Sequence, residues 1–282
     1  MKLKLIRTYF GLSSAIAPKR TGVKSFELFQ KVRIKKIRER EELFYSKTRK
    51  FNIEYEKEAI DCFELGNPQG KLVILVHGWE SNAGSMSQLA YKLGDQDYRV
   101  VAFNLPGHAF YETSTTNLLE CKLAMKAVLN FLQPTESFSV IAHSFGSAVV
   151  ANGLSNTDYK VDRLVFLTNP NKVEDIFTEF KETIGLSEKA YRSLIKRTTQ
   201  LLGAPISTLD VDTNLKQIKF EKLLMIHDVN DQVLPYSNSQ NIHSELENSQ
   251  LITLDKVGHY KMLWTDEVVD KATAFVQGNE VS

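Results

Sequence analysis

Ala142-His143-Ser144-Phe145-Gly146 is the segment that decides how this sequence folds. It follows an apolar run, residues 138–142, and precedes a segment of helical character, residues 147–151. A serine between small residues at a strand-to-helix junction is typical of a nucleophile elbow, a tight turn that lifts the hydroxyl out of the sheet. The N-terminus of the following helix favours developing negative charge. Such junctions also arise from packing alone, so the rest of the chain has to supply the other groups that catalysis requires.

Strand and helix patterns alternate from about residue 49 to the end of the chain. Most of the expected strands are short, fully apolar runs, which suit strands that are buried on both faces. The expected strands are residues 49–55, 60–65, 71–76, 99–104, 138–142, 164–167, 222–226 and 250–254. The expected helices are residues 85–93, 118–131, 147–154 and 266–277. This alternation predicts an α/β fold with a doubly wound, mostly parallel sheet that helices cover on both faces.

One interval, residues 171–215, is too long for a single crossover between neighbouring strands. It contains two helical stretches, residues 173–183 and 187–202, separated by Gly185. We interpret the interval as a small helical cap inserted over the carboxyl edge of the sheet. The alternative is a crossover with one extra helix that does not contact substrate. The chain is therefore divided into a basic N-terminal helical segment, residues 1–48, and a sheet domain with its cap insertion, residues 49–282.

Composition narrows the class of protein. A chain of 282 residues with 43% hydrophobic and 24% charged residues is ordinary for a globular enzyme. Cys62 and Cys121 are far apart and lack metal-ligand spacing, so neither a disulfide framework nor a zinc site is expected. The six histidines show no His-x-x-x-His spacing, and no Gly-rich phosphate loop is present. We therefore expect no metal and no cofactor.

The two cysteines and the N-terminus both bear on localisation. The two isolated cysteines favour a reducing compartment. The N-terminus faintly resembles a signal peptide with Ala15-Ile16-Ala17 as its cleavage site, but Pro18 would follow the cut directly. No run of about 18 apolar residues exists that would cross a membrane. A cytoplasmic location is therefore expected.

The N-terminal segment is strongly basic. Residues 1–50 contain 15 Lys or Arg and 4 Glu, a net charge of +11, whereas the remainder contains 20 Lys or Arg and 30 Asp or Glu, a net charge of −10. Phe26, Phe29, Val32 and Ile37 would fall on one side of a helix surrounded by basic residues. Such a helix either packs on the acidic body or docks residues 1–44 on anionic lipid, where each cation contributes about 1 kcal/mol. Nucleic-acid binding is disfavoured, because the body is acidic and no base-stacking motif is present.

Catalysis by a serine needs a base, a carboxylate that orients the base, and donors for the oxyanion. His259 is the candidate base, because it follows the last expected strand and Gly258 lets the chain turn. Asp231 is the candidate carboxylate, in the loop after residues 222–226, and Asp228 in the same loop is its competitor. We favour Asp231, because the turn that follows it would project its side chain towards a histidine after the next strand.

Backbone N–H groups are the candidate oxyanion donors. One belongs to Phe145, directly after the serine, and the other belongs to Trp79 in the loop after residues 71–76, where Gly78 allows a close backbone approach. Other side chains near these loops are candidates for lining a substrate pocket, although His77 and His143 more readily suit structural roles. The pocket candidates are His77, Gly78, His108, Tyr111, His143 and Tyr260.

The ordered set Ser144…Asp231…His259, together with the His-Gly-aromatic loop at 77–79 and Leu105-Pro106-Gly107-His108, resembles the α/β-hydrolase superfamily over about residues 49–282. Within it, the chain is similar to small esterase, lipase and aminopeptidase-like serine hydrolases. The resemblance implies a Ser–His–Asp triad, no metal, and ester, thioester or, less often, amide substrates. Two positions depart from the usual pattern, Ala142 in place of glycine and Asn104 in place of aspartate.

The sequence therefore predicts a serine hydrolase that cleaves a small carboxylic ester or thioester through an acyl-enzyme. An aminopeptidase-like amide hydrolase is an alternative, in which Glu174, Asp175 and Glu179 would hold the substrate amine. A second alternative is a hydrolase scaffold that binds a ligand without turning it over. A third alternative is a protein whose main role is to bind a membrane surface through its basic N-terminal segment. The sequence makes no prediction about oligomeric state.

Overall fold

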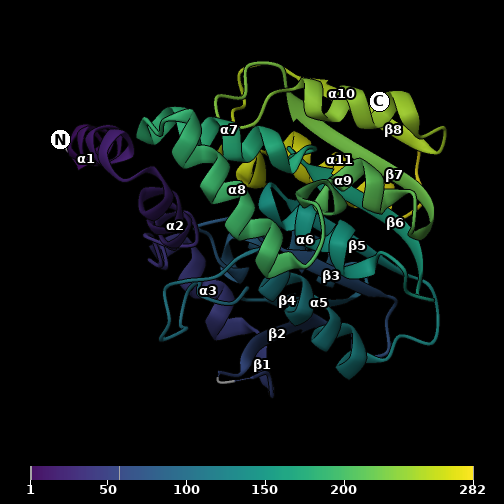
Figure 1. The fold of residues 1–282 in the computed structure, drawn as a ribbon. Coiled ribbons are helices and arrows are strands. Elements are labelled where there is room, and N and C mark those ends of the chain that lie inside the picture. Colours follow the sequence, from purple (N-terminus) through teal and green to yellow (C-terminus); the bar gives the residue numbers. More distant parts are fainter. Residues whose placement is uncertain (1, 57, 282) are drawn as a thin grey trace. The chain divides into compact units, whose positions relative to one another are not determined.

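The computed structural model describes residues 2–56 and 58–281 (Figure 1). Its contacts divide the chain into two compact units. The sheet unit comprises residues 32–171 and 211–282 apart from the undescribed positions, and the helical unit comprises residues 2–31 and 172–210. The expected boundary after residue 48 differs from this division, because residues 32–48 are grouped with the sheet.

The sheet unit is built on one sheet, which has eight strands within the described residues, in the order β1-β2-β4-β3-β5-β6-β7-β8. Strand β1 pairs antiparallel with β2, and β2 pairs antiparallel with β4. All the other pairings are parallel, which confirms the predicted mostly parallel sheet. The strands are β1 (Arg49–Ile53), β2 (Ile60–Gly66), β3 (Leu72–Val76), β4 (Arg99–Phe103), β5 (Phe138–His143), β6 (Lys160–Leu167), β7 (Lys219–Asp228) and β8 (Ser249–Leu254).

Helices cover both faces of this sheet, and strand β3 shows why its sequence is apolar throughout. Leu72, Ile74 and Val76 belong to one hydrophobic core, whereas Val73 and Leu75 belong to the core on the other face. Successive side chains of a strand point to opposite faces, so a strand between two cores has no polar position. The first core includes residues of α5 (Leu118–Leu132), α6 (Phe145–Leu154), α9 (Val211–Leu215) and α10 (Ser237–Glu245). The second includes residues of α3 (Glu39–Lys47), η1 (Ala83–Met86), α4 (Ser87–Gly94), η3 (Lys261–Trp264) and α11 (Asp266–Val276).

The parallel strands bring their carboxyl ends to one edge of the sheet, where open α/β folds bind their ligands. The loops that leave this edge after β3, β5, β6, β7 and β8 contain most of the polar residues singled out in the sequence. A site assembled from several strand ends is therefore possible without any long-range rearrangement of the chain.

The helical unit consists of α1 (Lys2–Ile16), α2 (Pro18–Phe29), α7 (Val173–Ile184), α8 (Glu188–Leu202) and the short η2 (Ile206–Leu209). Both helices expected within residues 171–215 are thus present, and their position over the sheet edge stays a prediction. Helices α2 and α8 approach each other at Gly22, where a Cβ would lie 2.3 Å from the carbonyl oxygen of Ala190. The core of the unit is formed by Phe10, Phe26, Phe177, Ile184, Leu186, Ala190 and Leu194. None of the helices that the structure describes has the length and apolar content needed to cross a bilayer.

The expectation that one helical face continues from Phe26 and Phe29 to Ile37 is wrong. Helix α2 ends at Phe29, and residues 32–38 have no helical structure. The N–H of Val32 donates a hydrogen bond to the carbonyl oxygen of Ser114 (2.9 Å). Tertiary hydrogen bonds of this kind replace those that a continuing helix would have made.

Candidate active site

Ser144 lies in the turn between β5 and α6. Its φ of 52° and ψ of −123° form a conformation that non-glycine residues rarely adopt. The Ser144 N–H donates to the carbonyl oxygen of Leu167 (3.0 Å), which ties the turn to the end of β6. Gly146 lies so close to β3 that a Cβ there would be 2.5 Å from the carbonyl oxygen of Val76. Ala142 is completely buried. Small residues on both sides therefore permit the strained turn that holds Ser144 at the sheet edge.

Hydrogen bonds join three side chains that come from three different loops. Ser144 Oγ lies 2.9 Å from His259 Nε2, and His259 Nδ1 lies 2.8 Å from Asp231 Oδ2. An ionised carboxylate can only accept, so Nδ1 carries the imidazole proton and Nε2 accepts from the Ser144 hydroxyl. All three side chains are largely buried. This is the connectivity that a serine nucleophile, a general base and an orienting carboxylate require.

Asp231 is held by hydrogen bonds on both of its oxygens. Oδ1 accepts from the N–H groups of Val233 (2.7 Å) and Leu234 (3.0 Å), and Oδ2 accepts from the Thr168 hydroxyl (2.5 Å) as well as from His259. Burial by itself would raise the pKa of Asp231, but the hydrogen bonds from His259, Thr168 and Leu234 outweigh it and hold the pKa well below its usual range. The carboxylate is therefore ionised and fixed in place beside the imidazole.

The competitor Asp228 binds backbone instead of the imidazole. Its Oδ1 accepts from the N–H of Asn230 (2.8 Å) and its Oδ2 accepts from the N–H of Gly258 (2.6 Å). Burial would raise the pKa of Asp228, but these backbone hydrogen bonds lower it below its ordinary value. Gly258 has a φ of 75°, which explains the glycine before His259. Asp228 thus shapes the loop that carries His259.

The loop after β3 and the start of α6 meet beside Ser144. A Cβ on Gly78 would lie 3.1 Å from the Cβ of Ser144, so the missing side chain permits the approach. The ring of Trp79 packs edge-to-face on the ring of Phe145, with 5.2 Å between centroids. Phe145 is the first residue of α6, so its N–H has no helical carbonyl one turn earlier to bond. The two backbone segments expected to donate N–H groups to an oxyanion are therefore neighbours.

His77 and His108 are completely buried between the loops after β3 and β4. Nδ1 of His77 donates to the carbonyl oxygen of Gly78 (2.7 Å), and the N–H of Leu105 donates to its Nε2 (3.0 Å). Nδ1 of His108 donates to the carbonyl oxygen of Pro106 (2.9 Å). Burial lowers the pKa of both imidazoles, that of His108 to about 4. His77 joins the two loops and has no free ring nitrogen for a substrate.

The remaining pocket candidates have different surroundings. His143 is buried, and its Nε2 donates to the backbone carbonyl oxygen of His259 (3.0 Å), so it supports the loop of the candidate base. Burial lowers the pKa of His143 to about 3. Tyr111 is buried as well, whereas Tyr260 is 63% exposed and its ring lies 5.0 Å from that of His259. Tyr260 is therefore available to a ligand beside His259.

Thr168 and His227 contact this site and were missed in the sequence. Thr168 follows β6 with a φ of 49°, which is unusual for a β-branched residue, and its hydroxyl donates to Asp231. His227 is completely buried, with Nε2 3.0 Å from Thr168 Oγ1 and Nδ1 2.7 Å from Ser239 Oγ. Both residues lie at strand ends on the same edge of the sheet as Asp231. This position is the feature of the sequence that could have identified them as neighbours of the site.

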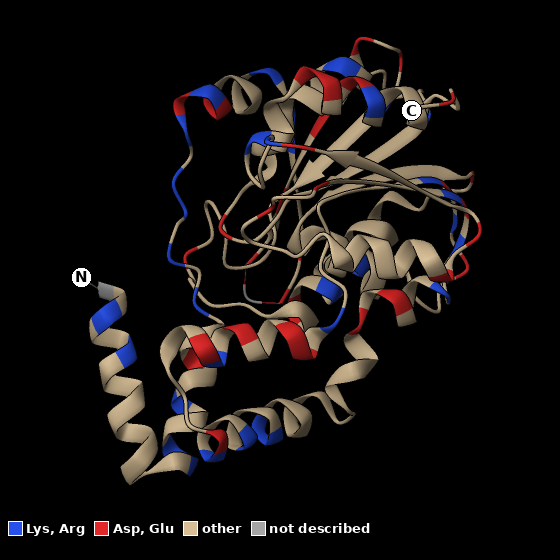
Figure 2. Ribbon diagram, turned by 90° about the horizontal axis from the view of Figure 1, so that it is seen from above, with Lys and Arg blue, Asp and Glu red and all other residues tan. Residues whose placement is uncertain are grey.

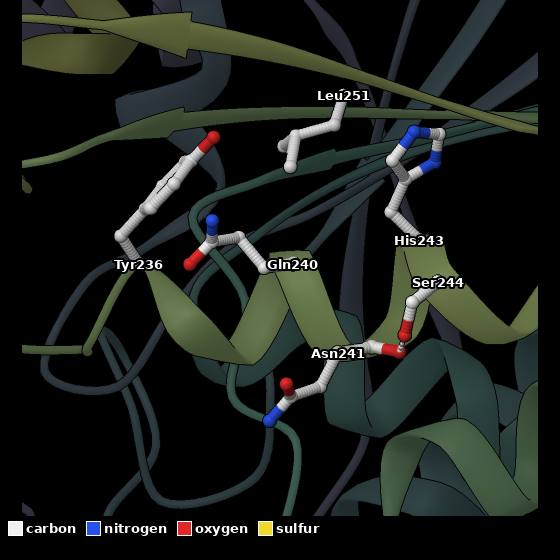
Figure 3. A pocket seen from close by; sticks show the side chains of 6 residues that line it. All are labelled: Tyr236, Gln240, Asn241, His243, Ser244 and Leu251. Atoms are coloured by element: carbon white, nitrogen blue, oxygen red, sulfur yellow. Dashed lines mark hydrogen bonds between the residues drawn. The ribbon is translucent and has the colours of Figure 1, made fainter.

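Two hollows lie in the sheet unit outside this group of residues. One, of about 620 Å³, lies along α10 and β8 (Figure 3) and is lined by Tyr236, Gln240, Asn241, His243, Ser244 and Leu251. The other, of about 340 Å³, is lined by Asn52, Glu58, Ala59, Asp61, Phe110, Tyr111 and Glu112. Tyr111 thus borders a hollow to which Ser144, Asp231 and His259 do not contribute. Over residues 2–56 and 58–281, no three His, Cys, Asp or Glu side chains are grouped as metal ligands would be.

Sequence comparisons relate the central part of the chain to known hydrolases. Residues 71–187 match a family model described as the alpha/beta hydrolase fold. A serine hydrolase-like protein of Danio rerio is 30% identical over 130 residues, which cover 42% of this chain and 38% of that protein. A serine hydrolase-like protein of Homo sapiens is 31% identical over 109 residues, which cover 37% of this chain and 53% of that protein. The matches thus span about a third to a half of these relatives.

Solved structures share the fold over most of the chain. An esterase of Pyrococcus furiosus superposes with a TM-score of 0.63 at 19% identity and covers 87% of this chain and 94% of its own. An esterase of Exiguobacterium antarcticum gives 0.63 at 16% identity, with 81% and 100% covered. A membrane phospholipase A, described as a bacterial virulence factor, gives 0.62 at 16% identity, with 99% of both chains covered. At these identities the likeness concerns the fold.

Proposed function

We propose that this chain, which has the α/β-hydrolase fold, is a serine hydrolase that cleaves carboxylic esters or thioesters through an acyl-enzyme. The observation that supports this most directly is the continuous chain of hydrogen bonds Ser144–His259–Asp231, with separations of 2.9 Å and 2.8 Å. The positive φ of Ser144 supports it independently, because strain of that kind persists where a surrounding fold enforces it.

In the acylation step, His259 Nε2 takes the proton of Ser144 as Oγ forms a bond to the acyl carbon. The electron pair of the carbonyl double bond moves to the oxygen, whose negative charge accepts hydrogen bonds from the N–H groups of Trp79 and Phe145. When the tetrahedral intermediate collapses, the bond to the leaving oxygen or sulfur breaks, and that atom takes the proton from His259. Asp231 keeps the imidazole in the tautomer that accepts at Nε2 and stabilises the imidazolium.

In the deacylation step, His259 takes a proton from water as the water oxygen attacks the acyl carbon. Collapse of the second intermediate breaks the bond to Ser144 Oγ, which recovers its proton from His259. The products are a carboxylic acid and an alcohol or thiol, and water is the only co-reactant. The two steps use the same base and the same oxyanion donors, so one arrangement of side chains serves both.

The names of similar proteins support hydrolysis as the reaction class. The curated relatives are described as serine hydrolase-like, and two of the structural neighbours are described as esterases. These names favour an ester over an amide as the bond that is cleaved. Esters and thioesters are also the substrates that this minimal set of groups attacks most easily, because an alkoxide or thiolate leaves more readily than an amine nitrogen.

Covalent labelling tests the nucleophile. A fluorophosphonate probe should label the wild-type protein on Ser144, and the S144A variant should not be labelled. The matched control is S147A, which removes another buried serine hydroxyl one turn along α6 and should still be labelled. Labelling that survives in S144A would contradict the assignment.

An activity screen tests the bond class. Purified protein is assayed with p-nitrophenyl esters of increasing acyl length, with acyl thioesters and with aminoacyl amides. Turnover of an ester or thioester that is lost in S144A is the expected result. Turnover of amides alone would refute the ester assignment. Saturable binding of the esters without release of product would favour a ligand-binding scaffold.

A further inference from the structure

Helix α1 has two apolar faces, and contacts within the helical unit cover one of them. Phe10 is buried on the covered face, where it joins the core of the unit. On the other face, four large side chains at positions i, i+4, i+7 and i+11 form one row along the helix, called here the α1 stripe. The α1 stripe consists of Leu5, Tyr9, Leu12 and Ile16, which are 65%, 47%, 65% and 86% exposed.

Four large exposed side chains in one row differ from the scattered apolar residues of an ordinary surface. The described part of the sheet unit also exposes large apolar side chains, but they are distributed over several loops and helices. Those residues are Ile34, Leu43, Phe110, Leu123, Phe131, Val229 and Tyr260. Because exposed apolar area is unfavourable, a contiguous row indicates a surface that is covered when the protein works.

Cations accompany the α1 stripe. Residues 2–31 contain seven Lys or Arg and one acidic residue, Glu27, a net charge of +6. Figure 2 shows Lys and Arg positions along α1 and α2. Lys24 of α2 lies directly beside the stripe, because its Nζ donates to the hydroxyl of Tyr9 (2.9 Å) and lies 5.0 Å from the centre of that ring. Lys4 and Arg20 are exposed as well.

We propose that the α1 stripe docks on the surface of a lipid bilayer that contains anionic lipids. The apolar side chains would enter the boundary between headgroups and acyl chains, and the surrounding Lys and Arg would pair with lipid phosphates. A helix with one apolar row and basic residues around it has the composition of an interfacial helix. The charge of the segment decides between occupants: a second copy of the same stripe would bring +6 against +6, whereas an anionic surface attracts it.

Vesicle co-sedimentation tests the apolar part of the proposal. The full chain should bind vesicles of equal parts phosphatidylcholine and phosphatidylglycerol. The L5E/L12E variant should bind at least about tenfold more weakly, because two side chains that would enter the bilayer become charged. The matched control is L123E/F131E, which places two glutamates at exposed apolar positions of α5 in the sheet unit and should bind like the wild type.

Charge reversal tests the electrostatic part. R20E/K24E should weaken binding about fivefold or more for each cation lost, and binding should fall as salt is added. K222E/K256E, which reverses two exposed lysines of the sheet unit, is the matched control and should bind normally. Vesicles of phosphatidylcholine alone should bind the wild-type protein much more weakly than the anionic vesicles.

Three results would overturn the proposal: no binding of the wild-type protein to anionic vesicles, equal binding by L5E/L12E, or loss of a dimer in L5E/L12E with vesicle binding unchanged. The last result would mean that the α1 stripe binds a second copy of the chain. Light scattering after size-exclusion chromatography detects such a dimer. Circular dichroism checks that the variants are folded. L5Q/L12Q removes the two apolar side chains without adding charge and should also weaken vesicle binding. S144A should bind vesicles normally, so this test does not depend on the proposed hydrolase activity.

Discussion

The two units of this protein depart from the usual distribution of polar and apolar residues in opposite directions. The sheet unit buries ionisable and hydroxyl side chains at one edge, among them Ser144, Asp231, His227 and His259. The helical unit exposes a row of large apolar side chains on α1. Both departures cost stability. We propose that the buried polar residues serve catalysis and that the exposed apolar row serves contact with a bilayer.

The two departures also differ in how they are compensated. Each oxygen of Asp231 accepts two hydrogen bonds, from Val233 and Leu234 on one side and from Thr168 and His259 on the other. Burial of this charge is therefore offset inside the fold. The α1 stripe is exposed in the helical unit, and we propose that a bilayer covers it. Catalysis should therefore not require lipid, whereas the effect of the stripe should be measurable only when lipid is added.

The largest expected effect separates the two units completely. S144A should lower kcat for a water-soluble ester by about 10⁵-fold or more, because the nucleophile is removed. The same variant should bind anionic vesicles like the wild type. L5E/L12E should show the reverse, with normal turnover of a water-soluble ester and weak vesicle binding. Steady-state kinetics and co-sedimentation on the same preparations measure both, and a joint loss in either variant would break the division into two independent surfaces.

The two buried carboxylates after β7 give the next largest effect. D231N should lower kcat by about 10⁴-fold, because an amide at that position favours the wrong imidazole tautomer. D228N should mainly lower stability, by about 1–3 kcal/mol, because one backbone N–H beside it loses its acceptor. Kinetics and urea unfolding of both variants measure the difference. A larger loss of kcat in D228N than in D231N would make Asp228 the functional carboxylate.

Strand ends explain how much of this site the sequence could predict. Ser144 directly follows β5, Asp231 lies shortly after β7 and His259 lies shortly after β8. The apolar runs are visible in the sequence, and parallel strands place their carboxyl ends together. The meeting of these three residues therefore needed only local patterns and one topological rule. The sheet itself followed from the same patterns.

Features that depend on tertiary contacts were not predictable in the same way. Thr168 directly follows an apolar strand, so its place at the sheet edge is visible in the sequence, but nothing local signals its positive φ or its hydrogen bond to Asp231. Val32 leaves the helical path because Ser114, far away in sequence, accepts its N–H. The outward face of α1 was equally hidden, because apolar side chains occur on more than one side of the helix and only the packing of Phe10 shows which face is covered.

Thr168 offers a finer test of how the sheet unit compensates its buried charge. T168V keeps the shape and removes the hydroxyl that donates to Asp231 Oδ2. We expect kcat to fall about tenfold, since a hydrogen bond to a charged group is lost. The pKa of Asp231 should rise, because a hydrogen bond that favours its charged form is lost. T168S restores the hydroxyl and should restore kcat. An unchanged kcat in T168V would reduce Thr168 to a packing residue.

The smallest expected effect concerns the stability of the fold in acid. All six histidines belong to the sheet unit, so a pH dependence caused by histidine should arise in that unit. Burial lowers the pKa of His143 to about 3, so between pH 6.5 and that value the unfolded chain binds a proton that the folded chain does not. Stability therefore falls as the pH falls, by about 1.4 kcal/mol per pH unit for this group.

H143Q keeps a donor for the backbone carbonyl of His259 and removes the titration. Its free energy of unfolding, from urea titrations across the same pH window, should depend less steeply on pH by about one proton. H243Q, which removes an exposed imidazole, controls for the substitution itself. An equally steep dependence in H143Q would mean that the folded protein already protonates His143. Water and protons would then reach the buried polar residues of the sheet edge more easily than their hydrogen bonds imply. The difference in exposure between this edge and the α1 stripe would be smaller.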